Sequence, residues 1–526
     1  MITRRQFIGR SAGIAAATAL GLTTDGAQAR STRPNIVIIM ADDMGFSDLG
    51  CYGSEIHTPN LDRMASEGLR FTQAYNSARC CPTRAALLTG LYPHQAGMGG
   101  MVSFPEQNRP QGPYQGYLNK NCATIAELLR PAGYRTYMSG KWHVGEAPDH
   151  WPRKRGFDRY FGIVSGGSSY WKLDTEGPRK RVMALDDESY VPSGDTFYMT
   201  DAFTDYAVKF VEEHSSAEQP FFLYLAYTAP HWPIHAWPED IEKYRGVYDI
   251  GWDELRARRH ERMIELGIVN KKWPLSPRDP EVPAWADVSD REDRALRMAV
   301  YAAMIDRMDQ GIGRVMESLR KTGADDNTLV LFLSDNGGCH EMVLDSPLHT
   351  PGTRAGERGS FLAYQRPWAN ASNTPFRMFK HWTHEGGIAT PLIARWPGEI
   401  RQHGELTKQV AHVTDLMPTC LDLADAAYPD SYEGNSLAPL PGSSIAPILR
   451  GKKREQREHL YWEHEGSKAI REGKWKLVSA VNRDWELFNL EADRTELNDL
   501  KRKEPRRAEA MLARWNKWAD AIGAKR

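Results

Sequence analysis

Short apolar runs that end in polar residues alternate along this chain with segments of helical periodicity. A continuous apolar run of about four to eight residues is typical of a strand buried on both faces. Such strands are expected at 34–43, 134–143, 220–231, 328–338 and 390–398, and the segment 69–75 alternates as a strand does. Helices are expected at 58–68, 124–133, 200–214 and 291–323. Elements that alternate in this way form a mostly parallel sheet between helices. The sequence therefore predicts an α/β fold with helices on both faces of one large sheet.

Polar residues that could bind a ligand or take part in catalysis gather where the predicted strands end. In an open α/β sheet, ligands bind beyond the carboxyl ends of the strands. The residues expected to meet there are Asp42, Asp43, Lys141, His143, His231, Asp335 and Asn336. The sequence thus predicts one functional site along one edge of the sheet.

The acidic members of this group offer only oxygen ligands. Asp42 and Asp43 follow the first strand, and Asp335 and Asn336 follow the strand at 328–338. Oxygen-rich sets suit Ca²⁺ or Mg²⁺, whereas zinc prefers His or Cys. Each acidic pair alone is also compatible with a solvated loop or a helix cap. Two pairs at strand ends favour a metal, and Ca²⁺ is preferred because it tolerates irregular geometry.

The pattern of the chain changes near residue 439. Three segments, 459–466, 468–478 and 485–490, read as short antiparallel strands, and a closing helix is expected near 504–520. We therefore predict a catalytic domain over 30–438 and a smaller C-terminal α+β domain with an antiparallel sheet over 439–526.

The first 29 residues resemble an export signal. Arg4 and Arg5 precede a short apolar stretch, and Ala27-Gln28-Ala29 fits a signal-peptidase site, so the mature chain is expected to begin near Arg30. This predicts twin-arginine export to the periplasm or the medium of a bacterium. An ordinary secretory signal would predict the same compartment, and a buried structural helix is the least favoured alternative. The apolar stretch is too short to span a bilayer, so no membrane span is expected.

The net charge limits the expected binding partners, and the cysteine content limits the expected disulfides. The formal net charge is −1, which gives no reason to expect nucleic acid or an anionic membrane as partner. Six cysteines in 526 residues are too few and too scattered for a dense disulfide framework, so most are expected to be buried small residues. Two of them, Cys80 and Cys81, are adjacent, and this pair needs an explanation of its own.

The segment NSARCCPTRAALLTG, residues 76–90, holds that pair within a C-x-P-x-R arrangement followed by L-T-G. Only Cys80 has the required spacing to Pro82 and Arg84. The arrangement resembles the signature of the type I sulfatases. Further blocks, among them PNIVIIMADDMGFSDLGCYGS, GYRTYMSGKWHVG, APHWP, LFLSDNGG and TPFRMFKHWTHEGG, are similar to arylsulfatase blocks and occur in the expected order. The chain is therefore identified as a type I sulfatase with an alkaline-phosphatase-like fold.

This resemblance implies a chemical role for each candidate residue. Cys80 would be oxidised to formylglycine by a formylglycine-generating or sulfatase-maturing enzyme, and its hydrate would attack sulfur to give a covalent sulfo-enzyme. Arg84 would brace the hydrate, and His143 would be the base that releases sulfate. Lys141 and Lys380 would contact the sulfate oxygens, and His231 with Lys380 would protonate the leaving oxygen. One Ca²⁺ per chain would be held by Asp42, Asp43, Cys80, Asp335 and Asn336.

The implied reaction is hydrolysis of an aryl or carbohydrate sulfate ester to an alcohol and inorganic sulfate. Phosphonate and phosphate monoester hydrolases of the same superfamily are one alternative, although alkaline-type phosphatases use zinc with His ligands that this set lacks. A sulfate-binding homologue without activity is the other, and it would require a broken site. All the residues named above are present in this chain.

Overall fold

The computed structural model describes residues 33–102, 110–175, 180–455 and 457–525. The predicted export signal, residues 1–29, lies outside these ranges. No helix within them is long and apolar enough to cross a membrane.

The main element is an eleven-stranded sheet. Its order is β10-β2-β9-β8-β1-β7-β3-β4-β5-β6, with β11 also paired to β2. The strands are β1 (Asn35–Ala41), β2 (Leu69–Tyr75), β3 (Arg135–Gly140), β4 (Arg159–Ile163), β5 (Met183–Leu185), β6 (Glu188–Tyr190), β7 (Phe221–Ala226), β8 (Thr328–Ser334), β9 (Ala389–Arg395), β10 (Glu405–Thr407) and β11 (Ala411–His412). The five central strands β8, β1, β7, β3 and β4 are parallel, which confirms the predicted mostly parallel sheet.

Two internal strands of this sheet, β9 and β5, run against this direction. β9 is antiparallel to both β8 and β2. β2 therefore runs the same way as β8, and its carboxyl end reaches the same edge of the sheet. The amino end of β9 also reaches that edge, so residues that precede β9 join residues that follow the other strands.

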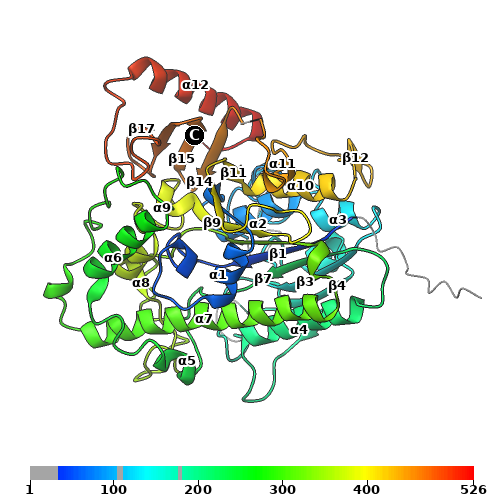
Figure 1. Ribbon diagram of the computed structural model, residues 1–526, viewed down its shortest axis with the longest axis horizontal. Helices are drawn as coiled ribbons and strands as arrows, with labels where there is room; N and C mark the ends of the chain where they lie inside the picture. The colour runs from blue at the N-terminus through cyan, green and yellow to red at the C-terminus, as the bar shows by residue number, and fades with distance from the viewer. Residues whose placement is uncertain (1–32, 103–109, 176–179, 456, 526) are drawn as a thin grey trace, which may run out of the picture.

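Helices cover both faces of the sheet (Figure 1). On one side α7 (Arg291–Lys321) and α4 (Met199–His214) lie next to each other, with α1 (Pro59–Ser66) and α5 (Pro238–Glu242) packed on α7. On the other side are α2 (Cys80–Thr89), α3 (Ile125–Leu129), α10 (Leu416–Leu423) and α11 (Ala446–Leu449). Beyond the sheet end lie α6 (Gly251–Glu265), α8 (Gln365–Ser372) and α9 (Glu385–Ile388).

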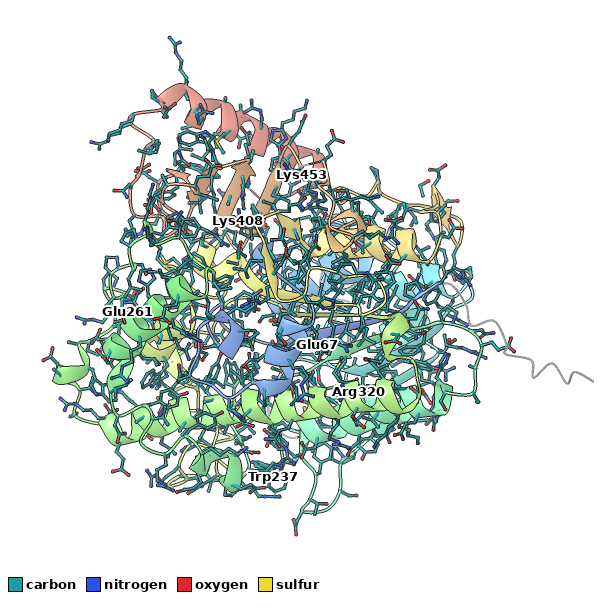
Figure 2. The ribbon with its side chains drawn as sticks, viewed as in Figure 1. Glu67, Trp237, Glu261, Arg320, Lys408 and Lys453 are labelled. Carbon is teal, nitrogen blue, oxygen red and sulfur yellow. The ribbon has the colours of Figure 1, made fainter. Side chains whose placement is uncertain are left out.

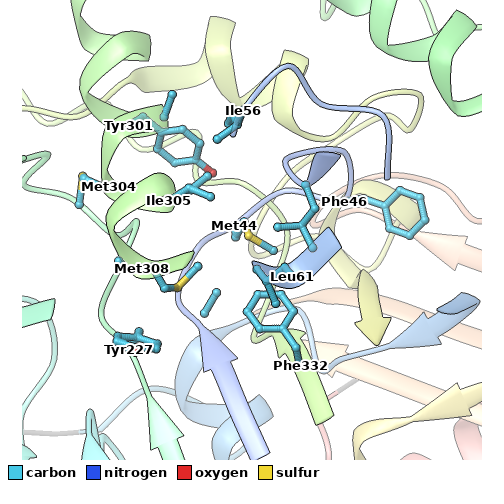
Figure 3. Packing of buried hydrophobic residues seen from close by; sticks show 14 of the residues in the cluster. Met44, Phe46, Ile56, Leu61, Tyr227, Tyr301, Met304, Ile305, Met308 and Phe332 are labelled. Atoms are coloured by element: carbon cyan, nitrogen blue, oxygen red, sulfur yellow. The ribbon is translucent and has the colours of Figure 1, made fainter. Parts of the chain in front are cut away.

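The two helical layers bury opposite faces of the same strands. Along β1, Val37 and Ile39 belong to the core on the α7 side, whereas Ile36 and Ile38 belong to the core on the α2 side. This division follows from the two-residue period of a strand and explains why the run is apolar throughout. Figure 3 shows the first of these cores, where side chains of α7 such as Met308 meet residues that follow β1 and residues of β8.

The C-terminal part forms the predicted smaller α+β unit. Four antiparallel strands, β14 (Leu460–His464), β15 (Ser467–Glu472), β16 (Trp475–Ser479) and β17 (Glu486–Asn489), are covered by α12 (Pro505–Ile522). The segment 468–478, which we expected to form one strand, contains parts of β15 and β16 and the turn between them. A further two-stranded ribbon pairs β12 (Ser431–Tyr432) with β13 (Asn435–Ser436).

Candidate active site

The sheet edge brings every predicted site residue into one buried cluster. Asp42 and Asp43 follow β1, Lys141 and His143 follow β3, and His231 follows β7. Asp335 and Asn336 follow β8, Cys80 and Arg84 lie on α2 after β2, and Lys380 precedes β9. All ten side chains are buried. Their meeting point is the one expected for a parallel sheet, with β9 adding a residue from the opposite chain direction.

Cys80 is the first residue of α2, and hydrogen bonds of the preceding turn fix its position. Asn76 Oδ1 accepts a hydrogen bond from the Ala78 amide at 3.0 Å, and Thr83 Oγ1 accepts one from the Ser77 amide at 2.9 Å. A helix N-terminus favours negative charge on the residue placed there. The turn therefore presents residue 80 at the positive end of α2.

The surroundings of Cys80 favour an anion. Hydrogen bonding from the Cys81 thiol and the charge of Lys141 lower the pKa of the Cys80 thiol well below its usual range although burial opposes this. Burial and the neighbouring Cys80 raise the pKa of Cys81 instead. The two adjacent cysteines therefore have opposite electrostatic environments.

Arg84 connects two strand ends behind Cys80. Its Nη2 donates to Asp335 Oδ2 at 2.8 Å, and its Nη1 donates to the Lys141 carbonyl at 3.0 Å. Lys141 Nζ in turn donates to Asp42 Oδ2 at 2.5 Å. Each charge in this buried chain has a partner of opposite sign, as a buried charge requires. Burial opposes ionisation of Asp42, yet Lys141, His231 and Arg84 outweigh it and lower the pKa of that carboxyl.

Asp43 organises the other half of the cluster. Its carboxylate accepts hydrogen bonds from Lys380 Nζ at 2.8 Å and from Asn336 Nδ2 at 2.8 Å. His231 Nε2 lies 3.5 Å from Asp43 Oδ2 and 3.5 Å from Lys380 Nζ. The other ring nitrogen of His231 contacts the Trp232 carbonyl at 2.5 Å, which orients the ring so that Nε2 faces the cluster. His231 Nε2 and Lys380 Nζ thus lie side by side next to the Asp43 carboxylate.

His143 and His231 each pack against a glycine. A Cβ atom at Gly166 would lie 2.9 Å from His143 Nε2, and one at Gly167 would lie 2.9 Å from His231 Nδ1. Burial and the charge of Lys141 lower the pKa of His143 to about 3. The imidazole of His143 is therefore neutral near pH 7.

The oxygen ligands fit a hard divalent cation. Within the described ranges, Asp42 Oδ1 and Asn336 Oδ1 are buried without a hydrogen-bond partner. Burial and the proximity of Asp42 raise the pKa of Asp335 well above its ordinary value. Unsatisfied buried oxygens and crowded carboxylates are both costly unless a cation joins them. The donor set contains carboxylate and amide oxygens, as Ca²⁺ prefers.

Two residues at the site were not predicted from the sequence. Glu341 Oε1 lies 2.9 Å from Arg79 Nη2, its Oε2 accepts from Trp232 Nε1 at 2.7 Å, and Lys380 Nζ lies 3.8 Å away. Burial opposes ionisation of Glu341, but Lys380 and Arg79 outweigh it and lower the pKa of the carboxyl. Neither residue could be recognised from sequence, because Glu341 is a single acid in a polar loop and Arg79 occupies a variable position of the motif. Together they form a partly exposed rim beside Lys380.

Comparison with known proteins identifies the chain. The family model described as Sulfatase matches residues 34–426, well over half of the sequence. The chain belongs to the sulfatase family. A second model, N-sulphoglucosamine sulphohydrolase, C-terminal, matches residues 376–517 of this sulfatase. The resemblance that the motifs indicated is thereby confirmed, and the protein is a sulfuric ester hydrolase.

Relatives agree over almost the whole length. An arylsulfatase of Klebsiella aerogenes is 36% identical over 462 residues, covering 85% of this chain and 98% of the relative. An uncharacterized sulfatase of Schizosaccharomyces pombe is 34% identical over 522 residues, covering 93% and 94%. Among solved structures, Ps i-CgsB in complex with k-i-k-neocarrahexaose has 28% identity, 93% coverage of both chains and a TM-score of 0.68. These relatives favour a sulfatase over a phosphonate or phosphate hydrolase.

Proposed function

We propose that this sulfatase hydrolyses aryl or carbohydrate sulfate esters at residue 80. The observation that carries the proposal is the electropositive, buried setting of Cys80 at the start of α2, beside Lys141 and the neutral His143. Formylglycine at this position would supply a geminal diol, one hydroxyl of which attacks sulfur while the other allows sulfate to leave. The thiol pKa reported above supports the idea that negative charge at residue 80 is stabilised.

The basic side chains supply binding and orientation. Lys141 and Lys380 each interact with a different carboxylate of the acidic cluster, Asp42 and Asp43 respectively. We infer that both ammonium groups contact sulfate oxygens and stabilise charge that develops in the transition state. Arg84, held by Asp335 and the Lys141 carbonyl, would position the hydroxyls of residue 80.

Two imidazoles would move protons. His143 belongs to a cluster in which its ring nitrogen and the sulfur atoms of Cys80 and Cys81 lie within 4.8 Å of one another. A neutral imidazole at that distance suits the base that removes a proton from residue 80. His231, with Nε2 beside Lys380, would deliver a proton to the departing alcohol oxygen.

The metal and the maturation belong to the same proposal. Asp42, Asp43, Asp335, Asn336 and the modified residue 80 would hold one Ca²⁺, and a bound cation would lower the pKa of an attached hydroxyl and offset charge on the sulfate. A formylglycine-generating or sulfatase-maturing enzyme would act on Cys80. Export through the twin-arginine signal at 1–29, to the periplasm or the medium, would follow.

The substrate is proposed as a class. The relatives include an arylsulfatase and the mouse N-acetylgalactosamine-6-sulfatase, which is 28% identical over 488 residues. A small aryl sulfate is therefore the expected assay substrate, and a sulfated saccharide the expected natural one.

Peptide mass spectrometry of residues 76–90 from the native host tests the proposal. Conversion of Cys80 to formylglycine removes about 18 Da at that residue, because SH and H are replaced by a carbonyl oxygen. We expect this loss at Cys80 and not at Cys81, together with hydrolysis of a phenyl sulfate and much slower hydrolysis of the matching phosphate. A Cys80→Ala variant should be inactive. Active protein with an unmodified Cys80 thiol would contradict the mechanism.

A further inference from the structure

A large basic cavity lies apart from the acidic cluster, where the C-terminal sheet meets the edge of the large sheet. Its volume is about 680 Å³, and it is lined by residues from β2, the loop after α6, the segments before β11 and β14, and the turn between β15 and β16. Figure 2 labels Lys408, one of its lining residues, at the junction of the two sheets. None of the predicted site residues lines this cavity.

The lining carries a strong excess of positive charge. Five cations line the cavity against one carboxylate; the cations are Lys408, Arg454, Arg457, Arg471 and Lys474, and the carboxylate is Glu491. The Glu491 carboxylate is 3.7 Å from Lys474 Nζ, and both side chains are largely exposed. The attraction within such a solvent-exposed ion pair is weak, so Glu491 does little to reduce the positive charge of the cavity. The cavity therefore holds a net charge that an anionic ligand would neutralise.

Two buried arginines share a single counter-ion. Asp415 Oδ2 lies 2.8 Å from Arg454 Nη2, and Asp415 Oδ1 lies 3.4 Å from Arg457 Nη2. The side chain of Arg457 is only 9% exposed, and its Nε and Nη1 have no hydrogen-bond partner in the part of the chain that the structure describes. One carboxylate for two guanidinium groups leaves about one positive charge uncompensated beneath the cavity.

Among the described residues, two further cations form no direct ion pair, although the charge of Arg471 also acts on the nearby buried Glu385. Arg471 donates to Tyr75 Oη, Gln73 Oε1 and the Gly473 carbonyl, all of which are neutral acceptors. Among the described residues, Lys408 forms no ion pair, and it is exposed. Positive groups that surround a concave surface concentrate their field within it and attract anions. A purely structural junction between two sheets would not need this charge.

The size and the remaining lining indicate the class of anion. A volume of this order is typical of sites for small organic ligands and exceeds what a single inorganic ion requires. The half-buried Trp273 and the apolar Val269 and Leu460 also line the cavity. The indole N–H of Trp273 is already bonded to the Glu491 carbonyl at 3.0 Å, so its ring offers apolar contact. Cationic and apolar groups together suit a sugar ring that carries sulfate groups.

We propose that this cavity is a second binding site for a sulfated saccharide, distinct from the centre at Cys80. The proposal deepens the proposed function, since it rests on saccharide sulfates as the ligand class, but it requires no catalytic step. Ligand bound here would hold a sulfated chain on the enzyme between hydrolytic events. The recognition would depend on Lys408, Lys474 and the uncompensated arginines.

A charge reversal of the two exposed lysines tests this site. The variant Lys408→Glu/Lys474→Glu and the control variant Lys120→Glu/Lys517→Glu, in which two exposed lysines outside the cavity change, are compared with wild type. A heparin-derived hexasaccharide, its desulfated form and inorganic sulfate are titrated calorimetrically, at low and at high salt, into mature protein that also carries Cys80→Ala. We expect the cavity variant to bind the sulfated hexasaccharide about tenfold or more weakly, and the control variant to bind it as wild type does.

The outcomes separate the two proposals. With Cys80 intact, all three proteins should hydrolyse 4-nitrophenyl sulfate with equal kcat/KM, because the lysines do not touch the catalytic cluster. Unchanged hexasaccharide affinity in the cavity variant would overturn the second site. Equal affinity for the desulfated sugar, or for inorganic sulfate alone, would overturn sulfated saccharide as its ligand. If the wild-type protein hydrolyses no sulfate ester but binds the hexasaccharide through Lys408 and Lys474, only the proposed function would be overturned.

Discussion

Replacement of Glu385 by glutamine would remove a buried carboxylate that joins the large sheet to the C-terminal unit. Its Oε1 accepts a hydrogen bond from Lys476 Nζ at 2.9 Å, and its Oε2 accepts one from Arg494 Nε at 2.8 Å. Tyr75 Oη donates to the same Oε2 at 3.0 Å and is itself bonded to Arg471. Within the part of the chain that the structure describes, a neutral amide would leave Arg494 without a paired carboxylate and Lys476 paired only with Glu496, and its NH₂ group would face other donors.

The structure gives the magnitude. Burial alone would raise the pKa of Glu385, but Lys476, Arg494 and Arg471 lower it from 4.5 to about 2. A shift of that size corresponds to about 3 kcal/mol of stability. Removal of one partner from a buried ion pair typically costs about 3–5 kcal/mol. We therefore expect Glu385→Gln to lower the free energy of opening of the C-terminal sheet by about 3 kcal/mol.

Amide hydrogen exchange of peptides from β15 and β16 measures this change directly. A loss of about 3 kcal/mol should speed their exchange by about 100-fold at pH 7. Glu491→Gln is the matched control, since this carboxylate is 75% exposed and should change exchange by less than about threefold. Exchange of these peptides in Glu385→Gln within threefold of wild type would refute the assignment of stability to this carboxylate.

The pH dependence follows from the same carboxylate. A lowered folded-state pKa means that its stabilisation is complete above about pH 4.5 and is lost as the pH falls towards 2. The difference in stability between wild type and Glu385→Gln should therefore be constant above about pH 5 and should shrink below it. A difference that grows on acidification would contradict this sign.

Three further changes test the catalytic centre. His231→Ala should slow hydrolysis of an alkyl or sugar sulfate about 100-fold or more. It should slow hydrolysis of 4-nitrophenyl sulfate much less, because a good leaving group needs no proton. Equal losses of rate for both substrates in steady-state kinetics would argue against proton delivery by His231. Cys81→Ala should retain activity within about tenfold and formylglycine at Cys80, because the Cys81 thiol is assigned no chemical step; mass spectrometry and kcat decide this. Removal of metal with a chelator should abolish activity, and Ca²⁺ should restore it better than Zn²⁺, as oxygen ligands demand; recovery with Zn²⁺ alone would exclude the calcium assignment.

Periodicity and strand-end position predicted much of this fold from sequence. Apolar runs identified β1, β3, β7, β8 and β9 because strands buried on both faces must be apolar throughout, and the expected helix at 291–323 is α7 with its end two residues earlier. The direction of β9 could not be predicted, since a local pattern carries no information about its neighbours. The hairpin between β15 and β16 was missed because the charged residues in its turn resemble those within the strands.

The candidate site shows the same division. Asp42 and Asp335 stand out because each begins a pair of oxygen-bearing residues, Asp-Asp or Asp-Asn, directly after a buried strand, whereas Lys380 could be identified only through the family resemblance. Glu341 was missed, since its partners Arg79 and Trp232 are distant in sequence and only folding brings them together. Its buried environment, which distinguishes it from a solvated acid, is a property of tertiary structure.

The burial of Cys80 also limits the time during which an enzyme could reach this residue. In the folded protein this residue is 1% exposed, so the proposed maturing enzyme would have to reach it before the centre closes. Closure needs Lys380, whose ammonium group bonds to Asp43 across 337 positions of the chain. About 300 residues separate Cys80 from Lys380, and ribosomes add about 5–20 residues per second. On the proposed function, the maturing enzyme would therefore have roughly 15–60 seconds between the synthesis of Cys80 and that of Lys380 in which to act.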